Sequence, residues 1–279
     1  MRISTGGSTH VGRVRSNNED AYRVVAPLNL FVLSDGMGGE AHGEVASSLA
    51  VETVSSHCTE AEGDPSATFF GTRRADLSEK TNRLASAVQL ANHRILESAA
   101  QNPKQRGMGA TVTALWLNGT RMSVAHVGDS RAYLLRTGAL EQLTRDHSLV
   151  AEQVRRGILT PQQADRSENQ SVLIRALGTQ EDVEVDADEF GLMNGDTVLL
   201  CSDGLTRMVT DPEIASTLLM QPDAQSAAER LIALANENGG EDNVTVVVVN
   251  LRPESNGFFA RLRTWMRPSP DVPASGGGK

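Results

Sequence analysis

The stretch Leu30-Phe-Val-Leu-Ser-Asp-Gly-Met-Gly-Gly39 places an acidic turn directly after an apolar run. A short apolar run that ends in a turn signal is typical of a buried strand. Asp-Gly is a common turn dipeptide, and a solvated aspartate is its ordinary interpretation. Here, however, Asp35 follows a strand that should be buried, and a buried carboxylate needs a compensating partner. The stretch therefore predicts a strand that delivers a carboxylate to a polar site.

The same arrangement recurs along the chain. Asp203 follows the apolar run 197–201, and Asp242 precedes the apolar run 244–251. Two further acidic turns are Arg15-Ser-Asn-Asn-Glu-Asp20 and Gly128-Asp-Ser-Arg131. Strand ends of this kind, brought together, would make an oxygen-rich site suited to Mg²⁺ or Mn²⁺. The six histidines have no zinc-binding spacing, so a zinc site is not expected.

The remaining periodicity predicts the fold class. Short segments rich in β-branched or apolar residues predict further strands at 110–116, 122–127, 132–135 and 183–190. Hairpin turns are expected at Asn118-Gly119 and Thr137-Gly138. Helical spacing and capping signals predict helices at 44–57, 77–99, 148–156, from Thr160-Pro161, at 211–219 and from 223 to about Gly239. Tight turns between strands and separate blocks of helices predict an α+β fold with antiparallel sheets.

Composition and charge limit the partners and the cellular compartment that we expect for this chain. The 279 residues carry a formal net charge of −9, although the segment from Arg252 onward holds five basic and two acidic residues. An acidic body repels a nucleic-acid backbone, so nucleic acid is not an expected partner. Cys58 and Cys201 form no CxxC pair, which favours a reducing compartment. No secretory signal pattern or membrane-spanning apolar run is present, so we expect a cytoplasmic protein.

Together the five acidic turns, in this order, resemble those of the metal-dependent protein serine/threonine phosphatases of the 2C type, particularly the bacterial branch. The resemblance runs from about Ile3 to Leu251 and includes Gly109-Ala-Thr111, Thr144-Arg-Asp-His-Ser-Leu149 and Ile174-Arg-Ala-Leu-Gly178. It implies a four-layer α-β-β-α sandwich with two antiparallel sheets and a metal cleft at one end. It also implies a catalytic domain over 1–252, with a flap near 148–178. The basic, Pro- and Gly-rich composition that follows predicts a flexible tail at 253–279.

The resemblance further implies a role for each acidic residue. Two ions, Mg²⁺ or Mn²⁺, are expected in the site, with a third and weaker ion beside them. The implied ligands are Asp35 as the bridge, Glu19 and the Gly36 carbonyl on one ion, Asp203 and Asp242 on the other, and Asp129, shared with Asp203, on the third. Arg15 would clamp the substrate phosphate, which suits a bidentate guanidinium. Asp20 would orient its neighbours or bind metal waters.

The expected chemistry is direct hydrolysis, in which Arg15, Asp35 and Asp203 are the catalytic residues. Two cations about 4 Å apart lower the pKa of a bridging water, so that hydroxide attacks phosphorus in line. Some relatives place a histidine, the proposed general acid, where this chain has Met37. His42 lies nearby, but we interpret it as a surface residue and expect a metal-bound water to protonate the leaving group. The expected substrates are phosphoproteins, including a bacterial Ser/Thr kinase, and the expected state is a monomer.

Two alternatives remain open at this point. Cys201-Ser-Asp-Gly-Leu-Thr-Arg207 has the C-x-x-G-x-x-R spacing of cysteine-dependent phosphatases. A buried strand cysteine is the favoured interpretation, because Asp203 inside that loop would repel a phosphate dianion. The second alternative is a binding module that keeps the fold without turnover. Asp146-His147 is interpreted as a turn, with Ser148 capping the helix that follows.

Overall fold

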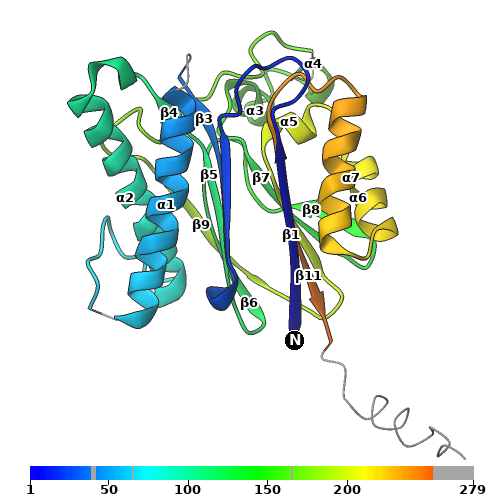
Figure 1. The fold of residues 1–279 in the computed structure, drawn as a ribbon, viewed down its shortest axis with the longest axis horizontal. Helices are drawn as coiled ribbons and strands as arrows, with labels where there is room; N and C mark the ends of the chain where they lie inside the picture. Colours follow the sequence, from blue (N-terminus) through cyan, green and yellow to red (C-terminus); the bar gives the residue numbers. More distant parts are fainter. Residues whose placement is uncertain (39–41, 65, 165, 254–279) are drawn as a thin grey trace, which may run out of the picture.

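The computed structural model describes residues 1–38, 42–64, 66–164 and 166–253. Two antiparallel sheets face each other, and helices cover the outer face of each (Figure 1). The predicted α+β class and the four-layer sandwich are confirmed. The predicted tail at 253–279 lies outside the described residues from residue 254 onward.

The first sheet is built around two apolar strands of the C-terminal half. Its order is β1 (Arg2–His10), β11 (Val244–Arg252), β10 (Thr197–Cys201), β7 (Arg131–Arg136) and β8 (Ala139–Gln142). All residues of β10, and all of β11 except Arg252, are buried, as their near-continuous apolar sequence predicts. The β7–β8 turn lies at Thr137-Gly138, as predicted, with positive φ at both residues.

The second sheet contains the apolar run that ends in the acidic turn at Asp35. Its order is β2 (Asp20–Val25), β3 (Leu30–Met37), β5 (Val112–Asn118), β6 (Arg121–Val127) and β9 (Asp186–Gly191), with the short β4 (Gly109–Ala110) paired to the end of β3. The β5–β6 hairpin turns just after Asn118. Because β2 and β3 are antiparallel neighbours, Asp20 pairs directly with Asp35.

Helices form the two outer layers of the sandwich. On the second sheet lie α1 (His42–Gly63) and α2 (Glu79–Gln101), while α6 (Asp211–Met220) and α7 (Ala224–Glu237) cover the first. The shorter helices are α3 (Leu149–Arg155), α4 (Pro161–Ala164), α5 (Asp203–Thr206), η1 (Ala26–Leu28) and η2 (Pro103–Gln105). Figure 1 shows α3, α4 and α5 at one end of the sandwich, where β3 also ends.

Apolar side chains fill the three spaces between these four layers. The sheets bury one cluster between them, which includes Phe31, Leu115 and Val247. A second cluster packs α1 and α2 against the second sheet, and a third packs α5, α6 and α7 against the first. This packing fixes the ends of β3 and β10 relative to each other, and those ends carry the acidic turns.

Some elements differ from the sequence prediction. The pattern did not predict β1, β2 or β8, whose apolar residues are too sparse or interrupted to stand out. Helix α1 extends beyond the predicted 44–57, and β9 begins at Asp186 because its pairing with β6 starts opposite His126. Asp203, which the sequence placed in a turn, is the first residue of a one-turn helix, α5. Among the described residues, no helix is both long and apolar enough to cross a membrane.

Candidate metal centre

A cavity of about 580 Å³ opens at the end of the sandwich where the acidic turns meet. Its wall includes every residue that the resemblance implied as a metal ligand or phosphate clamp: Arg15, Glu19, Asp35, Gly36, Asp129, Asp203 and Asp242. These residues come from widely separated parts of the chain, and the two sheets bring them together. Their individual roles stay predictions.

The end of β3 positions Asp35 through its backbone. The Asp35 N–H donates to Thr111 Oγ1 at 2.9 Å, and the Thr111 N–H donates to the Asp35 carbonyl at 2.8 Å. The Thr111 hydroxyl also lies 2.7 Å from Ser130 Oγ, next to Asp129. Thr111 therefore ties the strand that carries Asp35 to the loop that carries Asp129. The Gly109-Ala-Thr motif contained this residue, but sequence alone did not assign it a role.

Close backbone packing brings Glu19 beside Gly36. The Gly36 N–H donates to the Glu19 carbonyl at 3.1 Å. A Cβ atom on Gly36 would lie 2.0 Å from the Gly43 carbonyl oxygen, and one on Gly43 would lie 2.4 Å from Glu19 Oε2. Only glycine fits at either position, which explains the glycines around this turn. The Glu19 carboxylate and the Gly36 backbone consequently share one side of the cavity.

Asn243 is a positioning residue that the sequence reasoning missed. Its Oδ1 accepts the Glu19 N–H at 2.8 Å, and its Nδ2 donates to the carbonyls of Val11 at 2.9 Å and Asn17 at 2.8 Å. Asn243 thereby fixes the loop that bears Arg15 and Glu19 against the turn that bears Asp242. Its place next to Asp242 in an acidic turn was the signal that could have indicated this role.

The acidic groups are buried, and burial alters their ionisation. Burial is the main cause that raises the pKa of Asp20 to about 7 and that of Asp129 to about 8. Burial and the neighbouring carboxylates raise the pKa of Asp35 well above its usual range, and burial also raises that of Asp203. Asp20 Oδ1 and Asp203 Oδ1 are buried and have no hydrogen-bond partner in the described part of the chain. Such uncompensated oxygens fit a site that binds cations.

Two arginines pair with the acidic cluster. Arg15 Nη2 lies 2.8 Å from Asp242 Oδ2, and Arg207 Nη2 lies 2.5 Å from Asp203 Oδ2. Arg207 Nη1 is also 3.9 Å from Asp242 Oδ2. Sequence reasoning considered Arg207 only as part of the C-x-x-G-x-x-R match. Its spacing of one helical turn from Asp203 was the signal for this ion pair.

The donor set suits a divalent cation by its chemistry. In the described ranges, no three His, Cys, Asp or Glu side chains already stand close enough to hold one ion. Asp203 and Asp242 are instead engaged with the two guanidinium groups. Aspartate and glutamate oxygens with a backbone carbonyl are nevertheless the hard ligands that Mg²⁺ and Mn²⁺ prefer. The residues present therefore fit the expected ions by their chemistry.

The structure also places the residues of the alternative interpretations. Cys201 is fully buried within β10, and burial raises the pKa of its thiol to about 12. Because Cys201 lies inside a buried strand and does not line the cavity, it cannot reach a phosphate bound there, which excludes the cysteine-phosphatase interpretation. Met37 lines the cavity, whereas His42 does not belong to its lining. Ser148 caps α3 as predicted, accepting the Ala151 N–H at 3.3 Å.

The flap segment contributes to the same cavity. Ser171 and Leu173, neither of which was predicted as a site residue, form part of its wall. The bridge between Ala110 and Leu177 joins the segment to the body, and the bridge between Ser148 and Leu173 closes the segment on itself. The flap assignment itself stays a prediction.

Comparison with known proteins agrees with this geometry. The family model for protein phosphatase 2C matches residues 7–244. The chain belongs to the protein phosphatase 2C family.

The relatives are bacterial enzymes named as serine/threonine phosphatases. PstP of Mycobacterium tuberculosis is 41% identical over 240 residues, which are 86% of this chain and 43% of that protein. The chain thus spans less than half the length of that relative. The phosphatase stp of Listeria monocytogenes is 37% identical over 244 residues, covering 86% of this chain and 93% of that protein. A crystal structure of the PstP catalytic domain in complex with two manganese ions aligns with a TM-score of 0.76 at 37% identity, covering 90% of this chain and 99% of that one.

Proposed function

We propose that this chain hydrolyses phosphoserine and phosphothreonine in proteins, using two Mg²⁺ or Mn²⁺ ions held in the cavity. The observation that carries the proposal is the convergence of five carboxylates and Arg15 on one cavity at the end of the sandwich. The names of the relatives support the substrate class, and the manganese complex of the PstP catalytic domain supports the metal.

The ligand assignment is the one that the resemblance to the family implies. Asp35 would bridge the two ions, Glu19 and the Gly36 carbonyl would bind one, and Asp203 and Asp242 would bind the other. Asp129, beside Asp203, would bind a third and weaker ion. When bound, the ions would supply a hydroxide nucleophile at neutral pH and neutralise phosphate oxygens.

The chain's own residues would bind and orient the substrate. Arg15 is 57% exposed at the cavity rim, so its guanidinium can leave Asp242 and grip two phosphate oxygens. Asp20 lies behind the ligands, where its Oδ2 accepts the hydroxyls of Ser202 at 2.8 Å and Thr245 at 2.6 Å. These bonds lock the carboxyl group of Asp20, so that it can orient Asp35 across the strand pair.

The proposal also covers the domain bounds, the cellular location, the oligomeric state and the substrates. Residues 1–252 would form the catalytic domain, with 148–178 as a flap beside the active site. We propose a cytoplasmic monomer whose substrates include a Ser/Thr protein kinase, which the phosphatase would oppose. The physiological phosphoprotein would be identified by phosphoproteomics with and without an Asp203→Asn variant.

The decisive experiment measures turnover with and without metal. Hydrolysis of p-nitrophenyl phosphate and of phosphothreonine peptides is expected with Mn²⁺ and should stop in EDTA. Asp203→Asn should remove at least 99% of the activity, roughly 3 kcal/mol of barrier, while the fold persists. An absence of Mn²⁺-dependent turnover in a folded preparation would favour the binding module over the enzyme.

A further inference from the structure

His147 holds the residue next to Asp129 at two points. The Gly128 N–H donates to His147 Nδ1 at 3.0 Å, and the His147 N–H donates to the Gly128 carbonyl at 2.7 Å. Both polar backbone groups of Gly128 are therefore paired with the same residue. Asp129 follows directly and is 8% exposed in the wall of the cavity.

The turn at residue 128 requires glycine. Its φ is +112°, a conformation that L side chains rarely adopt. A Cβ atom there would lie 2.6 Å from Thr111 Cβ, so the loop passes very close to Thr111, the residue that positions Asp35. The direction in which the Asp129 side chain leaves the loop is thus set by a turn that His147 fastens.

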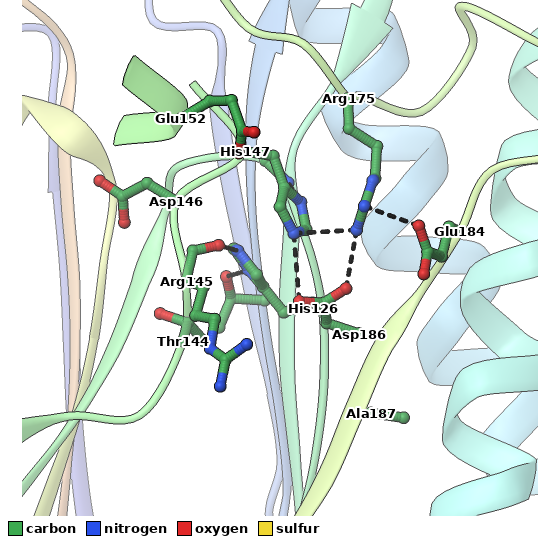
Figure 2. A network of polar contacts seen from close by, with 12 residues as sticks. His126, Thr144, Arg145, Asp146, His147, Glu152, Arg175, Glu184, Asp186 and Ala187 are labelled. Atoms are coloured by element: carbon green, nitrogen blue, oxygen red, sulfur yellow. Dashed lines mark hydrogen bonds and ion pairs between the residues drawn. The ribbon is translucent and has the colours of Figure 1, made fainter. Parts of the chain in front are cut away.

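The hydrogen bonds of His147 define its tautomer. A neutral imidazole has one donor and one acceptor nitrogen, and Nδ1 accepts from Gly128. Nε2 therefore carries the proton and faces Asp186 Oδ2 at 3.2 Å (Figure 2). Arg175 Nη1 lies 3.0 Å from the same ring nitrogen but donates to Asp186 Oδ1 at 2.7 Å. Asp186 accepts the proton on Nε2 and so favours the tautomer in which Nδ1 can accept the Gly128 N–H.

The surroundings keep this arrangement rigid. The His147 side chain is buried, and its ring lies against that of His126 with centroids 4.9 Å apart. Burial is the main cause that lowers the pKa of His126 to about 4, so His126 is neutral at physiological pH. Burial opposes ionisation of Asp186, but the bonds from His147 and Arg175 outweigh it and lower the pKa of Asp186 to about 2. Asp186 is therefore a permanent anionic partner for His147.

We propose that His147 and Asp186 form a positioning pair that aims the Asp129 carboxylate at the third cation position of the active site. This inference rests on the proposed function, because it gives that site a supporting residue. His147 touches no substrate or reacting atom and acts only through Gly128. Arg175, which holds Asp186, lies between the isolated bridge residues Leu173 and Leu177 at the end of the flap, and the Ile174 N–H donates to the His147 carbonyl at 2.8 Å. The pair therefore joins the base of the flap to the loop of Asp129.

The test measures Mn²⁺ binding by calorimetry, with no substrate present. The Mn²⁺-binding event that is lost in Asp129→Ala is the one that depends on Asp129. We expect His147→Ala to weaken that event about tenfold and to leave the tighter events within twofold, since outer-shell partners of metal ligands contribute on this scale. His147→Asn should restore most of the affinity, because Asn Oδ1 can accept the Gly128 N–H. Asp186→Asn should weaken the event less than His147→Ala.

A double variant separates positioning from general destabilisation. In the Asp129→Ala background, His147→Ala should cause no further change in Mn²⁺ binding, whereas a global loss of structure would still weaken the tighter events. The proposal is overturned if His147→Ala leaves the Asp129-dependent event unchanged, if all events weaken together, or if the wild-type protein has no such event. Turnover is measured separately. A shifted Asp129-dependent event without phosphatase activity would uphold the positioning pair and sink the proposed function.

Discussion

Asp20 and Asp35 pair directly across β2 and β3, so their carboxyl groups share one buried end of the sandwich. Opposite residues of an antiparallel pair point to the same face of the sheet. Burial raises the cost of ionising both groups, the Asp20 carboxylate adds to that cost at Asp35, and Asp203 repels both. The acidic centre consequently stores electrostatic strain that a divalent cation would relieve.

The first prediction concerns the pH dependence of stability without metal. A carboxyl group whose folded pKa is raised keeps its proton in the folded state and loses it on unfolding. Its contribution is complete below the unfolded pKa of 3.8 and is lost as pH rises through the folded value, about 7 for Asp20 and about 8 for Asp129. In EDTA, the free energy of unfolding should therefore fall between about pH 4 and pH 8. The slope is about 1.4 kcal/mol per pH unit for each proton concerned. Denaturant titrations at several pH values would measure it.

Two comparisons control that measurement. Asp20→Asn removes one group with a raised pKa, so the free energy of unfolding should fall less steeply with pH. Added Mn²⁺ should make the free energy of unfolding rise with pH instead, because ionised carboxylates bind the cation. Asp186, whose pKa is lowered to about 2, stabilises the folded state increasingly as pH rises from about 2 to 4, and it adds little slope above about pH 5. Stability that increases from pH 4 to pH 8 in EDTA would contradict the buried acidic centre.

The second prediction concerns Arg15. Arg15→Ala should reduce kcat/KM for phosphopeptides by roughly 10- to 100-fold, since a bidentate charged contact to phosphate is lost. Arg15→Lys should retain part of the activity, because lysine offers a point charge but no planar fork. Thermal denaturation should barely change, as the side chain is 57% exposed. Equal kcat/KM values for the wild type and Arg15→Ala would remove Arg15 from the phosphate site.

The third prediction concerns Arg207, whose positive charge lies among the metal ligands. Its guanidinium contacts Asp203 at 2.5 Å and approaches Asp242 at 3.9 Å. A fixed positive charge at this distance competes with a divalent cation for the same carboxylates. Arg207→Ala should therefore tighten Mn²⁺ binding by about 3- to 10-fold in calorimetric titrations, and Arg207→Lys should change it less. Weaker Mn²⁺ binding in Arg207→Ala would show that Arg207 organises the ligands instead.

The fourth prediction concerns the proton donor. His42 is the first residue of α1 and is absent from the cavity lining, where Met37 lies instead. His42→Ala should leave hydrolysis of p-nitrophenyl phosphate within about twofold of the wild type, whereas loss of a general acid typically costs about 100-fold or more. Steady-state kinetics with good and poor leaving groups would settle the matter. A hundredfold loss would assign the general acid to His42.

The fifth prediction concerns the flap. Helices α3 and α4 are short, and Val150 is the one buried residue that they contain. The isolated bridge from the flap to the body, Ala110–Leu177, lies beyond both helices. Few buried contacts and short helices imply local opening at low free energy. Backbone amides of 149–164 should exchange with deuterium much faster than those of α2, as measured by mass spectrometry. Protection equal to that of α2 would exclude a mobile flap.

The sequence by itself determined the kinds of structure and chemistry in this protein. Periodicity in apolar runs is local, so it indicated β3, β10 and β11, and the turn residues after or before them indicated the acidic ends. Carboxylates at the ends of buried strands already limited the cofactor to a hard divalent cation. Sparse strands such as β1 and β2 escaped prediction because their burial depends on the partners β11 and β3 rather than on their own residues.

Tertiary structure alone decided how the acidic turns cooperate. The pairing register places Asp20 opposite Asp35, and Asn243 reaches across 224 positions of sequence to hold Glu19. The clamp of His147 on Gly128 likewise exists only because the base of the flap packs against β6 and β9. Such contacts depend on how the layers pack, and no local pattern encodes that packing. The sequence thus specified which groups are available, and the packing of the two sheets decided which of them act on one another.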